Sequence, residues 1–256
     1  MIVGRVPPSS LQDQVDALVA QQGSDPREHE LLTTPVRDYG TPTSTPGANT
    51  TQGVLLESGT RAFHKTFAGV NTTVALAYGH HPDQVPINEC AAWRLAFAIG
   101  PPLADLVART VMWSYGGEAG ALIAGLDGIN QTREPFSVVP ERCLDAAFFD
   151  ALIAQQDRHI GNLRWDAAAG QLGLYDHGYA FAQPGYYLNS TEFVRFRCDQ
   201  GAEDLRPWEL AAIDALLTSP TLLGLREILL SDGADALEDR AQRMRASAKI
   251  LRPGEF

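Results

Sequence analysis

Two short segments in the second half of the chain carry side chains that could bind a metal ion and activate a hydroxyl group. Asp157 is followed after four residues by Asn162, and Asp176 comes after a strand-turn-strand pattern, with Gly178 two positions later. A first carboxylate can orient a hydroxyl group or take its proton, while an amide oxygen and a second carboxylate can share Mg²⁺ beneath phosphate groups. A turn cap at Asp157 and an ordinary turn at Asp176 would explain each residue singly. Their order and spacing together favour phosphoryl chemistry.

The two segments resemble a pair of motifs from known enzymes. The Asp-Arg-His-x-x-Asn motif that begins at Asp157 and the Asp-x-Gly motif that begins at Asp176 resemble those of phosphoinositide 3/4-kinase-like enzymes and HipA-type kinases. The resemblance implies ATP and Mg²⁺ as cofactors, with Asn162 and Asp176 as metal ligands. It implies that Asp157 orients the acceptor hydroxyl or takes its proton. It also implies that His159 braces the catalytic loop or takes part in proton transfer.

Lysine is rare in this chain, which makes its position informative. Of the 20 basic residues only Lys65 and Lys249 are lysines, and the other 18 are arginines. Lys65 lies in an apolar strand that follows a hairpin turn. In a narrow cleft, a compact ammonium suits a phosphate clamp better than a planar guanidinium does. A lysine that extends from a strand edge into solvent is the simpler alternative. The downstream motifs favour the clamp.

A glutamate on the next predicted helix could hold that lysine. Segment 86–101 has a proline near its start, apolar residues at helical spacing and a Gly-Pro stop. Glu89 is its only acidic residue and lies in the first expected turn, where stabilisation of the helix dipole would also explain it. The position matches the lysine-pairing glutamate of the enzymes that the chain resembles. The resemblance therefore implies that Glu89 positions Lys65 on the ATP phosphates.

The pattern along the chain predicts an α+β class. The resemblance implies a small two-lobed protein-kinase-like fold with a β-rich N-lobe and a helical C-lobe. We expect residues 1–52 to hold a helix at 10–22 and a flexible polar segment at 23–51, residues 53–125 to form the N-lobe, and residues 126–256 to form the C-lobe. The strands are expected at 53–59, 61–67, 106–115, 119–124, 163–165 and 172–175. The further helices are expected at 140–156, 207–217, 222–230 and 234–251.

Two connecting segments occupy positions that matter for a nucleotide. Segment 41–53 stands where a phosphate-covering loop belongs, and its backbone amides and hydroxyls could reach ATP. It has no G-x-G-x-x-G pattern, so a plain flexible linker also fits. Segment 125–128 stands where a lobe connector would face the adenine.

Composition narrows the class of partner. There are 31 acidic and 20 basic residues, a formal charge of −11, which argues against nucleic acid and anionic membrane surfaces as partners. Three separated cysteines without a CxxC pair indicate reduced thiols, not a disulfide framework or a zinc site. Neither a signal peptide nor a membrane span stands out. We therefore expect a cytoplasmic protein.

These observations together predict an ATP- and Mg²⁺-dependent kinase that moves the γ-phosphate to a hydroxyl of a soluble acceptor, either a small molecule or a protein Ser/Thr. Two alternatives stay open. A pseudokinase would bind nucleotide and dock a partner, for which the last helix, with an apolar seam among basic residues, is a candidate. A nucleotidyltransferase on the same fold would leave AMP on the acceptor, so the mass added to the product separates it from a kinase.

The substitution Lys65→Arg tests the argument from lysine scarcity. Arginine keeps the charge but misplaces it in a tight cleft, and a misplacement of about 1 Å can cost on the order of a hundredfold in rate. We expect nucleotide turnover to fall by about that factor, with little change in melting temperature, and Lys65→Met to lower turnover further. Full turnover of Lys65→Arg would place this residue at the strand edge.

Overall fold

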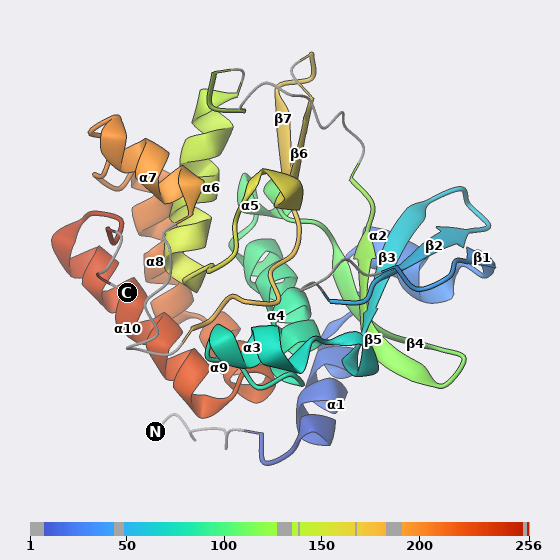
Figure 1. The fold of residues 1–256 in the computed structure, drawn as a ribbon. Helices are drawn as coiled ribbons and strands as arrows, with labels where there is room; N and C mark the ends of the chain where they lie inside the picture. Colours follow the sequence, from blue (N-terminus) through green and yellow to red (C-terminus); the bar gives the residue numbers. More distant parts are fainter. Residues whose placement is uncertain are drawn as a thin grey trace.

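The computed structural model describes residues 8–43, 49–126, 135–137, 139–166, 168–182, 191–252 and 255. A sheet lies on one side of the molecule and a group of helices on the other (Figure 1). The sheet is antiparallel, with its five strands in the order β1-β2-β3-β5-β4. The strand bounds are β1 Val36–Tyr39, β2 Gln52–Leu56, β3 Arg61–Thr66, β4 Thr110–Tyr115 and β5 Glu118–Ala124.

The side chains of β3 alternate between the two faces of the sheet, as the pleat of a strand requires. Arg61, Phe63 and Lys65 line the cleft between the sheet and the helical part. His64 points to the other face, where it is fully buried and its ring lies 4.9 Å from that of Trp113. Burial lowers the pKa of His64 to about 4, so the ring is neutral at physiological pH. The register of β3 thus separates Lys65 from His64.

One buried helix connects the sheet to the rest of the molecule. The helices of the first half are α1 Leu11–Gln21, α2 Pro26–Thr33, α3 Thr72–Ala77, α4 Gln84–Ile99 and α5 Leu103–Leu106, and a 3₁₀ turn η1 spans Phe67–Gly69. Every residue from Val85 to Ala96 in α4 is buried, because this helix contacts β4, β5, α1 and α9. A helix that is buried on all sides needs apolar or paired side chains all round.

The helical part carries a small hairpin that lies between α6 and the sheet (Figure 1). The hairpin consists of β6 Leu163–Asp166 and β7 Gln171–Leu174, close to the predicted positions. The helices are α6 Pro140–Ile153, α7 Glu192–Asp199, α8 Pro207–Thr218, α9 Pro220–Ile228 and α10 Ser231–Ser247, with 3₁₀ turns η2 Pro135–Ser137 and η3 Ile160–Asn162. The sequence did not indicate α7 as a separate helix.

The segment 23–51 differs from the expected polar connection, because it contains α2 and β1. Asp25 caps α2, since its side chain accepts a hydrogen bond from the N–H of Arg27, and a proline occupies the first helical position. Glu28 of α2 is fully buried. Its carboxylate accepts a hydrogen bond from the indole N–H of Trp93 and forms an ion pair with Arg94, both in α4. These contacts hold α2 against the core, so the segment contains two regular elements that the sequence analysis did not predict.

Three other elements are shorter than expected. The strand predicted at 106–115 begins at Thr110, because α5 and an isolated bridge precede it. Helix α6 ends at Ile153, since Ala154 adopts a left-handed backbone with φ of 48°. Helix α10 ends at Ser247, since the next residue also has a positive φ, 52°.

Parts of the two connecting segments fall outside the described residues. These are 44–48 within the expected phosphate-covering loop and 127–128 within the expected lobe connector. The division of the chain at 52/53 and 125/126 stays a prediction.

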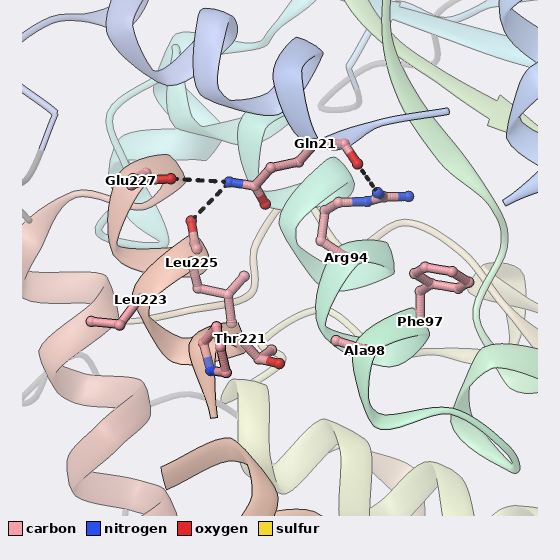
Figure 2. A pocket seen from close by; sticks show the side chains of 10 residues that line it. Gln21, Arg94, Phe97, Ala98, Thr221, Leu223, Leu225 and Glu227 are labelled. Carbon is pink, nitrogen blue, oxygen red and sulfur yellow. Dashed lines mark hydrogen bonds between the residues drawn. The ribbon is translucent and has the colours of Figure 1, made fainter. Parts of the chain in front are cut away.

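Gln21 at the end of α1 joins three helices (Figure 2). Its side-chain Nε2 donates to the main-chain carbonyl oxygen of Gly224 in α9 at 3.2 Å. The main-chain carbonyl oxygen of Gln21 accepts from Nη1 of Arg94 in α4 at 2.6 Å. A cavity of about 410 Å³ lies beside this junction, with Phe97 and Leu225 among its lining residues. The junction fixes α4 relative to α1 and α9.

The last helix packs on its own chain. The apolar positions of α10 that the sequence predicts as a packing seam are buried from Leu237 to Met244. Arg240, one of the basic residues beside that seam, also points inward and donates to the carbonyl oxygens of Leu152 and Ala182 at 3.0 Å each. The inner face of this helix is therefore used within the fold.

All three cysteines are free thiols, and burial raises the pKa of Cys143 to about 12, which makes it unreactive. Within the described ranges, no helix is both long and apolar enough to cross a membrane.

The substitution Phe148→Ala tests the core of the helical part. Phe148 in α6 is fully buried and meets the ring of Trp208 edge-on at 5.2 Å. Truncation leaves a cavity, so we expect the free energy of unfolding in urea to fall by about 3–5 kcal/mol. Val19→Ala, on the exposed face of α1, is the control and should stay within about 0.5 kcal/mol of the parent. Equal effects of the two changes would contradict the packing of α6 described above.

Candidate active site

The ammonium group of Lys65 joins the sheet, α4 and the second motif. Its Nζ donates to Oε1 of Glu89 at 2.7 Å and to Oδ1 of Asp176 at 2.5 Å. The side chains of Lys65 and Glu89 are 9% and 1% exposed, whereas that of Asp176 is 28% exposed. Glu89 lies in the second turn of α4 and not the first, because the helix begins at Gln84. The structure thus brings together three of the residues that the sequence predicts.

In this cluster the ammonium of Lys65 pairs with two carboxylates, those of Glu89 and Asp176. Burial acts to lower the pKa of Lys65, but Asp176 and Glu89 outweigh it and raise that pKa, so the ammonium stays charged. Burial raises the pKa of Glu89. Burial is the largest effect on Asp176 and acts in the same direction, but Lys65 and Arg158 together outweigh it and lower the pKa of Asp176. Asp176 is therefore the charged carboxylate that reaches the cleft.

A buried arginine ties the catalytic loop to its surroundings. Arg158 pairs with Asp150 of α6 at 3.1 Å, and both side chains are fully buried. Its Nη1 also donates to the carbonyl oxygens of Asn162 at 3.2 Å and Tyr175 at 2.6 Å. The arginine thereby fixes the loop against α6 and against the end of β7. Sequence reasoning did not assign this role, although its signals were present: the arginine of the Asp-Arg-His motif, and Asp150 among apolar neighbours in α6.

The first motif places a carboxylate and an amide next to each other. Asn162 donates from Nδ2 to the carbonyl oxygen of Asp157 at 2.6 Å, which leaves the amide oxygen as the atom that can take a cation. The carboxylate of Asp157 accepts a hydrogen bond from the hydroxyl of Tyr78 at 3.1 Å. Burial and the negative charge of Asp176 raise the pKa of Asp157. Sequence reasoning missed Tyr78, because nothing local connects it to the motif.

The second motif has a backbone that only a few residue types adopt. Asp176 has φ of 64°, a left-handed conformation that costs an ordinary residue about 1–3 kcal/mol, and Gln155 donates to its carbonyl oxygen at 3.0 Å. A Cβ atom at Gly178 would lie 2.5 Å from a methyl carbon of Val85, so only glycine lets the loop approach α4. Asn88 of α4 holds this approach by donating to the carbonyl oxygen of Gly178 at 3.0 Å.

The donor atoms fit a hard divalent cation. Asn162 offers an amide oxygen and Asp176 a charged carboxylate, the ligand types that Mg²⁺ takes from proteins. The repulsion between Asp157 and Asp176 is one that a cation would relieve. No cluster of three or more His, Cys, Asp or Glu side chains within the described ranges forms a complete metal cage. The pair thus suits an ion whose remaining ligands are phosphate oxygens and water.

The cleft beside Lys65 is large enough for a nucleotide. Its volume is about 850 Å³, within the range of small-molecule sites. Phe63, Ile123 and Leu126 contribute apolar walls. The charged part of the lining consists of Asp176 and four cations, Lys65, Arg61, Arg109 and Arg164. Such a cleft suits a ligand that combines a flat apolar group with an anionic group.

The two histidines of the motifs have different surroundings. His159 is exposed, and its Nδ1 accepts a hydrogen bond from the N–H of Gly161 at 3.0 Å, which closes the turn of the catalytic loop. A part for His159 in proton transfer stays a prediction. His177 is buried, and its main-chain N–H donates to Glu89 at 2.7 Å. Burial lowers the pKa of its ring well below the usual value, so His177 is neutral.

Comparison with known proteins identifies the fold. No protein-family model matches the sequence, and no curated protein matches it. The crystal structure of the Golgi casein kinase matches 88% of this chain and 78% of its own, with 13% identity and a TM-score of 0.51. The structure of that kinase with Mn/ADP bound matches 88% and 76%, with 13% identity and a TM-score of 0.52. The proinflammatory kinase CtkA of Helicobacter pylori matches 86% and 94%, with 12% identity and a TM-score of 0.42.

The two Golgi casein kinase structures confirm the predicted fold class. The protein has an α+β, protein-kinase-like fold with an antiparallel sheet and a helical part. At 13% identity the likeness reaches only the fold. The narrower resemblance to phosphoinositide 3/4-kinase-like and HipA-type enzymes stays a prediction.

A double-mutant cycle on Lys65 and Glu89 tests the buried ion pair. Lys65→Met leaves Glu89 buried without its cation, so we expect the free energy of unfolding to fall by about 3–5 kcal/mol. Adding Glu89→Gln removes the unpaired charge and should restore part of that loss, measured by urea denaturation. Additive effects of the two changes would contradict a direct interaction between these side chains.

Proposed function

We propose that the protein is a kinase that transfers the γ-phosphate of ATP to a hydroxyl group of a soluble acceptor. The observation that carries the proposal is the position of Lys65, which lines the cleft and is held between Glu89 and Asp176. Asp157 lies close enough to Asp176 for the charge of Asp176 to raise its pKa, and Asn162 is bonded to Asp157. Phosphoryl transfer requires a cation for the phosphates, metal ligands and a residue for the acceptor hydroxyl, and these side chains can supply all three. A structure that shares the fold was solved with Mn/ADP bound, which supports nucleotide and divalent-metal ligands here.

In this proposal, Lys65 keeps Glu89 as its partner and exchanges Asp176 for phosphate oxygens of ATP. The ammonium of Lys65 keeps an anionic partner in this exchange, because a phosphate replaces the carboxylate of Asp176. Asp176 is then available, together with the amide oxygen of Asn162, to hold Mg²⁺. A bound Mg²⁺ would neutralise the charge on the phosphates and on the leaving group.

Asp157 orients the acceptor hydroxyl and takes its proton. Phosphoryl transfer passes through a loose transition state, so the position of the hydroxyl matters more than the strength of the base. Arg158 and Asn162 fix the main chain on either side of this carboxylate, which supplies that position. His159 keeps the loop turned through its contact with Gly161.

The acceptor is inferred from charge. The net charge of −11 disfavours anionic lipid surfaces and nucleic acid. A small hydroxylated molecule or a protein Ser/Thr therefore fits better, in the cytoplasm, as the sequence also predicts.

Charge-removing substitutions test the assignment of the two carboxylates. Asp176→Asn and Asp157→Asn keep the shape of the side chain and remove its charge. We expect each to lower Mg²⁺-dependent release of ADP from ATP by about a hundredfold or more. Asp239→Asn, at an exposed carboxylate of α10, is the matched control and should keep normal turnover. Near-normal turnover of both site variants would contradict the assignment.

Thermal denaturation with and without ATP and Mg²⁺ accompanies that assay. Ligand at about 100 times its dissociation constant stabilises the folded state by about 2.7 kcal/mol, so the melting temperature of the parent should rise. Stabilisation without any turnover would favour the pseudokinase, and AMP on the product would favour nucleotidyl transfer. If ATP and Mg²⁺ cause no stabilisation and no turnover is detected, the kinase, the pseudokinase and the nucleotidyltransferase are all contradicted.

A further inference from the structure

A tyrosine from the first half of the chain reaches the carboxylate that the proposed reaction uses. Tyr78 is the residue directly after α3, and its hydroxyl donates to Oδ1 of Asp157 at 3.1 Å. In a kinase site, the hydroxyl that donates to this aspartate is that of the phosphate acceptor. Tyr78 therefore holds its hydroxyl where the proposed reaction requires an acceptor hydroxyl to be.

The ring of Tyr78 is held in this position by its hydrogen bond to Asp157 and by a second aromatic ring. It stacks on Tyr179, with ring centroids 4.6 Å apart and an angle of 28° between the planes. Asn49 donates to the hydroxyl of Tyr179 at 3.1 Å and accepts from the main-chain N–H of Asn71 at 2.8 Å. Tyr179 follows the second motif by one residue, so the stacked pair also stays next to Asp176. The tyrosine is thus fixed at the site and is only partly exposed.

We propose that Tyr78 is an internal phosphate acceptor, which this chain modifies on itself when it binds ATP and Mg²⁺. This inference rests on the proposed kinase function. The phenol oxygen attacks the γ-phosphorus, the bond from that phosphorus to the β–γ bridging oxygen breaks, and ADP leaves. The phenol proton passes to Asp157, so the products are ADP and one phosphotyrosine.

The electrostatics of the site make this reaction depend on a base and limit its extent. Burial and the neighbouring Asp157 raise the pKa of Tyr78 to about 12, so its hydroxyl keeps its proton at neutral pH until the base accepts it. A phosphotyrosine would bring about two negative charges next to Asp157 and Asp176. These like charges repel and oppose formation of the product, and the single hydroxyl of Tyr78 lets each chain accept at most one phosphoryl group here.

The experiment incubates the full chain with γ-labelled ATP and Mg²⁺ and locates the label by mass spectrometry. Trypsin releases residues 66–94, in which Tyr78 is the only tyrosine and the other hydroxyls are three threonines. We expect phosphotyrosine in this peptide, with a labelled fraction that does not change when the protein is diluted. Tyr78→Phe should lose the label from the peptide while its melting temperature still rises with ATP and Mg²⁺.

Two controls separate this inference from the function on which it rests. Tyr115→Phe removes an exposed tyrosine hydroxyl far from Asp157 along the chain and should keep the label, whereas Asp157→Asn should lose it. ADP release by the parent without phosphotyrosine at Tyr78 would overturn the inference and leave the kinase proposal standing. Neither ADP release nor label would overturn both. A labelled fraction that falls on dilution would show transfer between chains and overturn the internal acceptor.

Discussion

The structure depends on a single ammonium group that is buried between two carboxylates. Removing a charge from water is costly, and in a protein interior it is tolerated only where opposite charges and hydrogen bonds compensate. Lys65 meets this condition through Glu89 and Asp176, which come from different parts of the chain. The register of β3, the depth of α4 and the left-handed backbone of Asp176 all serve this contact. A change in any of the three would leave a charge unpaired in the core.

A second buried pair fixes the loop that approaches this cluster. Arg158 and Asp150 are both inaccessible to solvent, and the remaining guanidinium donors bind main-chain carbonyl oxygens of the two motifs. In an interior of low dielectric constant such a network is rigid when it is fully paired. The carboxylates that face the cleft therefore sit on a frame whose own polar groups are satisfied internally. Rigid support of this kind is what an active site needs to hold its charged groups in place.

Fold and function rest on different observations in this protein. The likeness to the Golgi casein kinase extends over most of both chains, but 13% identity leaves only the arrangement of sheet and helices in common. A fold supports many activities, so the activity has to be argued from the side chains of the candidate site. These are one of the two lysines in the chain, two aspartates that repel each other, and an amide whose oxygen can accept a cation. Their chemistry, and not the likeness, supports a phosphate-bearing ligand.

The sequence by itself determined the features that depend on near neighbours. The spacing of the motifs from Asp157 to Gly178, the hairpin before Lys65 and the apolar periodicity of α4 and α6 are local patterns, and each predicted element formed close to its expected place. Only the tertiary structure decided which distant residues complete the site. Tyr78 and Asp157 are separated by 79 positions, and Lys65 and Asp176 by 111. Contacts of this kind follow from how α4, the sheet and the loops pack together. A single sequence carries no periodic signal for them, so packing alone placed a tyrosine hydroxyl on the aspartate of the proposed reaction.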